Sequence, residues 1–178
     1  MNDMFKKLGL MIVLGALASP VMADTYMDAA WAKKACNAWN KSATLTAGLA
    51  KVSEGKSWVK NNGGRGYKLV RMYRSSCGAP SSIQLVIQDK GGKAMCTSAG
   101  KADAKKMNFG TDYLMHASDK NWACMGAGSF GCGAMGAMMS GKLKFQGPKM
   151  EAMSVMGPFG AFLKIAGKTP GVKTSCPK

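Results

Sequence analysis

The sequence is poor in acidic residues and contains a single histidine. Only 9 residues are Asp or Glu, against 25 Lys and Arg, and the formal net charge is +16 over 178 residues. Glycosidases use a pair of carboxylates, and these dispersed acids offer no candidate pair. Ala127–Gly131 resembles a hydrolase nucleophile elbow in its letters, but such an elbow needs a histidine later in the chain and His116 comes earlier. We therefore expect no catalytic residues and no enzymatic activity.

The cysteines form no redox or metal-binding motif. No C-x-x-C occurs, which argues against a thioredoxin-type pair, a zinc knuckle and a haem attachment site, so we expect no metal. An even number of cysteines in an exported chain is typical of disulfides. Their pairing stays open, although Cys124 and Cys132 would close a short loop most easily, whereas a simple meander places Cys77 and Cys96 too far apart. The disulfide candidates are Cys36, Cys77, Cys96, Cys124, Cys132 and Cys176.

No cofactor motif is supported by its surroundings. Gly126-x-Gly128-x-x-Gly131 matches the sequence motif of a dinucleotide-binding fingerprint. However, no predicted strand leads into it and no parallel βαβ unit surrounds it, as that fingerprint requires. We interpret the segment as a flexible or closely packed loop and expect no cofactor.

The N-terminal apolar run is too short to span a bilayer. Leu8–Ala18 has 11 residues, about half of the ~20 that a membrane-spanning helix needs. It follows two lysines and precedes the small residues of Val21-Met22-Ala23. This succession is typical of a secretory signal peptide cleaved before Asp24. We predict a periplasmic or secreted protein that has lost residues 1–23.

Lysine supplies most of the positive charge, since only Arg65, Arg71 and Arg74 are arginines. Nucleic-acid readers favour arginine forks and interleaved aromatic residues, so we expect no nucleic-acid partner. Scattered lysines can attract a protein to an anionic membrane surface, at ~1 kcal/mol for each well-placed side chain. The charge therefore indicates either a transient membrane contact or simply a well-solvated surface.

Hydrophobic periodicity predicts an α+β fold. Steps of three and four residues predict a helix over 26–52, opened by a capping box at Thr25 and interrupted near Ser42 or Gly48. Alternation and turn residues predict five strands, the second and third joined by a hairpin at 89–92. The strands are expected at Tyr67–Arg74, Ile83–Ile87, Lys93–Ser98, Lys106–Gly110 and Lys142–Gln146. Their order favours a mainly antiparallel sheet covered by helices.

Three further helices are expected in the second half of the chain. Thr111-Asp112 predicts a cap followed by a helix through Tyr113–Met115, and a short helix is expected near Ala134–Met139. A C-terminal helix begins after Gly147-Pro148, kinks or restarts at Pro158 and ends at Gly167. Segment 24–60 forms one domain with 61–167, and 168–178 is an extended tail.

Methionine is concentrated in the C-terminal half, with seven between Met125 and Met156. Met150, Met153 and Met156 recur at three-residue steps on one helix face. Three interpretations stay open: ordinary core packing, a plastic apolar cavity, or a thioether site for Cu(I), which soft sulfur ligands select.

The segment from Met138 to Lys149, MMSGKLKFQGPK, followed by Glu151-Ala152-Met153, resembles the C-terminal signature of the sterol carrier protein type-2 family. Asp103–Tyr113 resembles the short fourth strand of that family and the helix after it, and the likeness spans roughly Tyr67–Gly167. It implies a five-stranded sheet covered by helices, with an apolar tunnel that carries sterols, fatty acyl chains or similar lipids without catalysis.

We therefore predict an exported lipid-binding protein, because a lined cavity needs few polar contacts when each buried CH₂ contributes ~0.8 kcal/mol. A periplasmic Cu(I)-binding protein using the methionine clusters is the alternative. The predicted lipid-cavity residues are Met135, Met138, Met139, Phe145, Met150, Met153, Met156, Phe159, Phe162 and Leu163.

Overall fold

The computed structural model describes residues 24–53 and 56–178, with the side chains of 52, 53 and 56 left out. The predicted signal peptide at 1–23 lies outside the described residues. Among the helices that are described, none combines the length and the apolar character that crossing a membrane requires.

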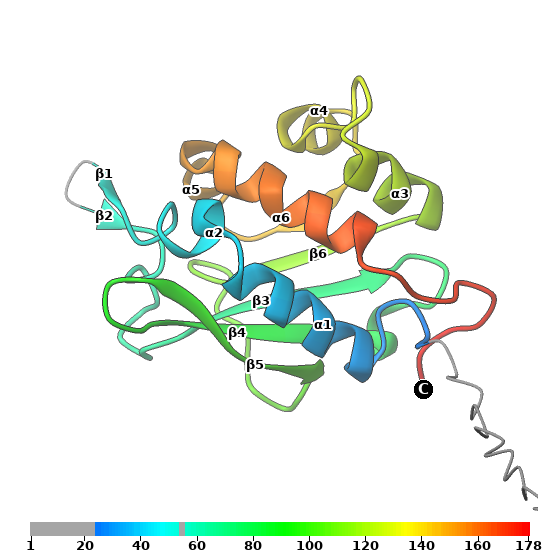
Figure 1. Ribbon diagram of the computed structural model, residues 1–178, viewed down its shortest axis with the longest axis horizontal. Helices are drawn as coiled ribbons and strands as arrows, with labels where there is room; N and C mark the ends of the chain where they lie inside the picture. The colour runs from blue at the N-terminus through cyan, green and yellow to red at the C-terminus, as the bar shows by residue number, and fades with distance from the viewer. Residues whose placement is uncertain (1–23, 54–55) are drawn as a thin grey trace, which may run out of the picture.

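A five-stranded sheet forms the centre of the molecule (Figure 1). Its spatial order is β5-β4-β3-β6-β7, and every neighbouring pair is antiparallel except β3 and β6. The expected α+β class with a mainly antiparallel sheet is therefore confirmed. The strands are β3 Lys68–Arg74, β4 Ile83–Asp89, β5 Ala94–Lys101, β6 Tyr113–Ala117 and β7 Lys144–Gln146; β1 Val52–Ser53 and β2 Lys56–Ser57 form a separate two-stranded ribbon.

Six α-helices and one 3₁₀ turn complete the described fold, and the buried faces of α1 and α6 share one core with the sheet (Figure 1). The helices are α1 Ala29–Asn40, α2 Ala43–Thr46, α3 Asp119–Ala127, α4 Ala134–Met139, α5 Lys149–Ser154 and α6 Met156–Lys168, and the 3₁₀ turn η1 is Ala79–Ser81. The inward-facing positions of β3 are Lys68, Val70, Met72 and Arg74, since alternate residues share one face of a strand. Position 68 therefore faces the helices.

The first helix is shorter than its periodicity predicts. The carboxylate of Asp28 accepts the Trp31 backbone N–H at 2.7 Å and caps α1, whose buried stripe includes Trp31 and Trp39. The helix ends at Asn40, and Ser42 caps the separate short helix α2. The expected interruption near Ser42 is confirmed, whereas a helix continuing to residue 52 is wrong because the chain turns after Thr46.

The prediction of a strand at Lys106–Gly110 followed by a helix at 113–115 is wrong. Residues 102–112 form the connection from β5 to β6, and Arg71 donates to the backbone carbonyls of Asp103 and Lys105 within it. Tyr113–Ala117 is strand β6, in which buried and half-buried positions alternate with period two. Asp112 caps no helix; its carboxylate accepts hydrogen bonds from Arg65 and from the backbone N–H groups of residues 69 and 108.

The C-terminal helix restarts earlier than expected. Val155, with φ −119° and ψ 36°, separates α5 from α6. Pro158 then lies in the first turn of α6, where a missing backbone N–H costs little. The predicted break at Pro158 is therefore displaced by three residues towards the N-terminus, and α6 runs to Lys168.

Helix α3 crosses α6 through a contact between two glycines. A Cβ atom placed on Gly126 would lie 2.5 Å from the carbonyl carbon of Gly167. The two backbones therefore approach more closely than any larger residue allows. Helix α3 itself was not expected from the sequence.

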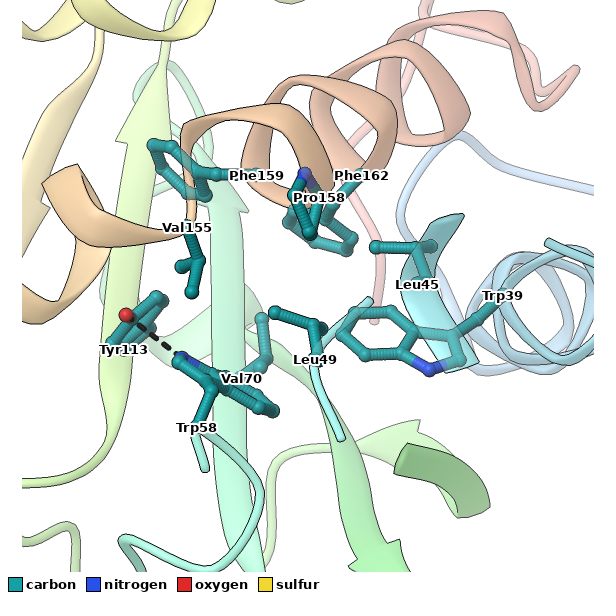
Figure 2. Close-up of a pocket in the computed structure, with 10 residues that line it drawn as sticks. All are labelled: Trp39, Leu45, Leu49, Trp58, Val70, Tyr113, Val155, Pro158, Phe159 and Phe162. Carbon is teal, nitrogen blue, oxygen red and sulfur yellow. Dashed lines mark hydrogen bonds between the residues drawn. The ribbon is translucent and has the colours of Figure 1, made fainter. Parts of the chain in front are cut away.

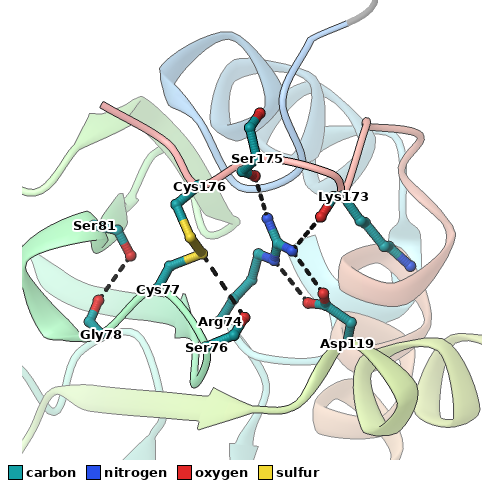
Figure 3. Close-up of a disulfide and its surroundings, with 9 residues drawn as sticks. All are labelled: Arg74, Ser76, Cys77, Gly78, Ser81, Asp119, Lys173, Ser175 and Cys176. Atoms are coloured by element: carbon teal, nitrogen blue, oxygen red, sulfur yellow. Dashed lines mark hydrogen bonds and ion pairs between the residues drawn. A yellow bond between two sulfur atoms is a disulfide. The ribbon is translucent and has the colours of Figure 1, made fainter.

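All six cysteines are paired, as Cys36–Cys96, Cys77–Cys176 and Cys124–Cys132. The expectation of oxidised cysteines agrees with this pairing. Cys36–Cys96 joins α1 to β5, and Cys77–Cys176 fastens the C-terminal tail beside the end of β3 (Figure 3). Arg74 strengthens that attachment, because its guanidinium pairs with Asp119 and donates to the carbonyls of Lys173 and Ser175.

The tail also contacts the beginning of the described chain. Thr25 and Val172 form a parallel β-bridge. The Tyr26 hydroxyl donates to the carbonyl of Ala166 at 2.8 Å, and the Trp31 indole donates to the carbonyl of Thr169 at 3.0 Å. The predicted extended tail is therefore part of the packed structure.

Candidate ligand-binding site

An apolar pocket lies between α6, α2 and the inner face of the sheet (Figure 2). Its wall is supplied by ten residues, Trp39, Leu45, Leu49, Trp58, Val70, Tyr113, Val155, Pro158, Phe159 and Phe162. The enclosed space is only about 10 Å³, roughly that of one water molecule. The side chains therefore fill the pocket, and a larger ligand requires the wall to move.

The wall presents almost only carbon to the pocket, because its few polar atoms are bonded elsewhere. The Trp39 indole N–H donates to the carbonyl of Ala94 at 2.8 Å. The Trp58 indole N–H donates to the Tyr113 hydroxyl, also at 2.8 Å (Figure 2). Since these donors are already satisfied, an apolar guest displaces no hydrogen bond when it enters.

Edge-to-face aromatic contacts give the pocket its shape. The ring centroids of Trp39 and Phe162 lie 5.6 Å apart, and those of Trp58 and Tyr113 are separated by the same distance. Phe159 packs on Tyr113 at 6.1 Å. Such pairs fit flat or elongated apolar groups, and Phe159 and Phe162 have no polar side-chain atom that fixes the orientation of their rings.

A second, open hollow of about 560 Å³ has Phe145 in its wall. It is lined by His116, Met138, Met139, Gly141, Leu143, Lys144, Phe145, Gln146, Lys149 and Met153. The Phe145 ring is 4.9 Å from Tyr113 and 5.8 Å from Phe159, both of which line the pocket. Phe145 therefore lines the hollow and packs against two residues of the pocket wall, and α5 contributes Lys149 and Met153 to the hollow.

The structure divides the residues predicted for the lipid cavity into four groups. Phe159 and Phe162 line the inner pocket, while four others line the open hollow: Met138, Met139, Phe145 and Met153. Leu163 is buried in the core, and the half-buried Met156 packs against it. Met135 and Met150 are exposed and line neither space.

A buried ion pair lies beside the pocket. The Lys68 side chain has no exposed surface, and its Nζ donates to Glu151 Oε1 at 2.6 Å. Burial lowers the pKa of Lys68, and the Glu151 carboxylate opposes that shift. Lys68 Nζ also lies 4.2 Å from the centre of the Trp58 ring, which forms part of the pocket wall. A positive charge is thus held at the boundary of an apolar space.

Sequence reasoning did not identify Lys68, Glu151, Trp58 or Tyr113 as site residues. Lys68 did carry a signal, because it shares its strand face with Val70 and is therefore a charged residue at an inward-facing position. Trp58 and Tyr113 gave no comparable signal, since they come from a turn and from a strand that was predicted as a helix.

His116 does not assemble a catalytic group in the described part of the chain. Its Nδ1 is hydrogen-bonded to Ser75 Oγ at 2.9 Å, and its ring stacks on Tyr73 with centroids 4.5 Å apart. No described carboxylate bonds to the imidazole, so the pair lacks the third member of a triad. Nor does any group of three His, Cys, Asp or Glu side chains among the described residues have the arrangement of a metal site.

Comparison with known proteins supports the fold predicted from the resemblance. No family model matches the chain, and no curated protein matches it. A crystal structure of sterol carrier protein 2 aligns with a TM-score of 0.50 at 17% identity, over 81% of this chain and 98% of that one. A conserved hypothetical protein from Thermus thermophilus, with a suggested assignment as a sterol carrier protein, gives 0.49 at 15% identity, over 84% and 95%. The chain therefore has the sterol carrier protein 2 fold.

Proposed function

We propose that this protein binds a lipid, either a sterol or a fatty acyl chain, between α6 and the sheet. The observation that carries the proposal is the apolar pocket, whose aromatic wall has its polar atoms bonded elsewhere. The sterol carrier protein 2 fold adds to it, since the structural neighbour is named for carrying sterol. The six cysteines offer no free thiol, and no described feature favours the Cu(I) alternative.

Lipid binding requires the pocket to open towards the hollow. Small-molecule sites commonly occupy ~300–1,000 Å³, far more than the space now enclosed. The hollow already has such a volume, and Phe145, which lines it, packs against Tyr113 and Phe159 of the pocket wall. A lipid tail that displaced Phe145 and moved α5 about Val155 would join them into one channel, with the methionines Met138, Met139 and Met153 at its mouth.

The mouth of this channel also fits an anionic membrane surface, from which lipid would be taken up. Two of the methionines that line the hollow, Met139 and Met153, are exposed, and the neighbouring segments of the chain expose Phe130, Met135 and Met150. The segment from Lys120 to Met150 contains four lysines and no acidic residue. Three disulfides suit the oxidising compartment of an exported protein, so we propose that this exchange takes place outside the cytoplasm.

A fluorescent acyl or sterol probe tests the proposal. Val155→Trp places a large ring at the pocket wall and is expected to weaken probe binding at least about tenfold, since the added ring occupies the volume that the lipid needs. Ser154→Trp, one residue away and exposed, is the matched control and is expected to bind normally. Parent protein that takes up neither probe at any concentration would refute lipid binding.

A further inference from the structure

The carboxylate of Glu151 occupies a site built from three hydrogen-bond donors. Lys68 Nζ and the Tyr113 hydroxyl both donate to Oε1, at 2.6 and 3.1 Å, and Asn61 Nδ2 donates to Oε2. Because the Tyr113 hydroxyl accepts the Trp58 indole N–H, its own proton is directed to the carboxylate. Burial and the charge of Glu151 raise the pKa of Tyr113, so the phenol keeps that proton.

This carboxylate site adjoins the apolar pocket. Trp58 and Tyr113 line the pocket on one side, and on the other they face Lys68, whose Nζ is 4.2 and 5.4 Å from their ring centres. Val155, which also lines the pocket, follows Glu151 by one helical turn. A cation and two hydrogen-bond donors therefore stand where the head group of a lipid in the pocket would lie.

The two members of the ion pair differ in how firmly the fold holds them. Lys68 is on the central strand β3, has no exposed surface and cannot leave without disrupting the sheet. Glu151 is on α5, a six-residue helix bounded by Pro148 and Val155, with Met150 exposed beside it. A movement of α5 would leave the Lys68 charge buried and unpaired, which is strongly unfavourable unless another anion replaces Glu151.

We propose that the carboxylate of a fatty acid or other acidic lipid takes the place of Glu151 on Lys68, Tyr113 and Asn61. The ligand anion then compensates the buried charge while its hydrocarbon chain fills the pocket. A neutral lipid of the same length leaves Lys68 without a partner. This proposal rests on the lipid-binding function proposed above and specifies its ligand class as carboxylated lipids.

Oleic acid, oleyl alcohol and methyl oleate test the proposal, because they share one hydrocarbon chain and differ in the head group. Displacement of a bound fluorescent acyl probe from the full chain gives the three affinities. Parent protein is expected to bind oleate at least about tenfold more tightly than the two neutral lipids. Equal affinities overturn the carboxylate site but leave lipid binding intact, whereas no binding of any of the three overturns both proposals.

Substitutions of Lys68 and Glu151 test whether this ion pair causes the preference for oleate over the neutral lipids. Glu151→Gln removes the competing carboxylate and is expected to tighten oleate binding. Lys68→Met combined with Glu151→Gln removes both charges of this pair, so the fold should persist, and the variant is expected to bind oleate and oleyl alcohol within about threefold of each other. Lys60→Met, an exposed control two residues from Trp58, should keep the parent preference. A preference that survives the double substitution overturns the role of Lys68.

Discussion

The single histidine, His116, is half-buried on β6 and sensitive to its neighbours. Burial lowers its pKa, and the positive charge of Lys144 lowers it further. The folded protein therefore binds a proton on His116 less readily than the unfolded chain does. The stability that this difference contributes is present above the unfolded pKa of ~6.5 and is lost as the pH falls through the folded pKa.

The lowered pKa of His116 predicts how the free energy of unfolding changes between pH 7.5 and 5.5. Over that interval we expect the parent to lose more stability than His116→Gln, which has no titrating ring. Urea denaturation of both proteins at several pH values measures the difference. Identical pH dependence in the two proteins would contradict the lowered pKa.

At the level of single residues, only part of the candidate site could be predicted from the sequence. Phe159 and Phe162 were predicted because they lie in a segment with a recognisable signature, and they do line the pocket. Trp39, Leu49 and Trp58 were not predicted, since nothing in local spacing indicates which apolar residues of distant segments face one cavity. The donor set around Glu151 joins positions 61, 68, 113 and 151, and only the folded sheet brings these together.

At the level of helices and strands, the crossing of α3 over α6 requires glycine at positions 126 and 167, where the two backbones meet. Gly126→Ala would place a Cβ against the backbone of Gly167 and force the helices apart, which we expect to destabilise the protein by about 2 kcal/mol. Gly160→Ala is the matched control within α6, because a Cβ there meets no atom within 4 Å. Alanine favours a helix over glycine by about 1 kcal/mol, so the control should be neutral or stabilising.

Thermal or urea unfolding of the two alanine variants measures this contrast. A Gly126→Ala protein as stable as the parent would show that α3 and α6 can separate at little cost. Both variants keep every residue of the proposed pocket.

Elements with long alternating patterns were predicted well, whereas among the short ones α4 and β7 were located and β6 and α3 were not. Strands β3, β4 and β5 have seven or eight residues each and were located to within a few positions. Strand β6 has five residues and follows Thr111-Asp112, whose capping chemistry favoured a helix instead. Pairing decided the outcome, because β6 fits beside β3 in parallel, with Val70 opposite Tyr113. Helix α3 was missed because Gly126 and the glycines that follow the helix lower the helix propensity of this segment.

At the scale of the molecule, lysines lie near the mouth of the proposed channel, although they are scattered along the sequence. Lys144 and Lys149 line the hollow, Lys142 precedes them in the chain, and no acid occurs between Lys120 and Met150. We expect tighter binding to phosphatidylglycerol vesicles than to phosphatidylcholine vesicles, and a decrease with added salt because screening weakens exposed charges.

Replacing these three lysines together with Gln is expected to weaken binding to the anionic vesicles about 100-fold, at ~1 kcal/mol for each lysine. A control with Gln at Lys33, Lys90 and Lys93 removes the same total charge from α1 and the β4–β5 hairpin. Vesicle co-sedimentation of the two variants compares them. An equal loss in both would assign the effect to net charge alone and contradict a specific docking face.

The contact between the two ends of the described chain has a consequence for the order in which the protein is made. Tyr26 and Trp31 leave a ribosome or a translocation pore among the first core residues. The carbonyls that they bond, on Ala166 and Thr169, follow 140 and 138 residues later. Helix α1 therefore cannot complete its packing until nearly the whole chain has been delivered, because contacts so distant in sequence form late. A chain delivered N-terminus first therefore leaves these two hydrogen bonds open until its last residues arrive.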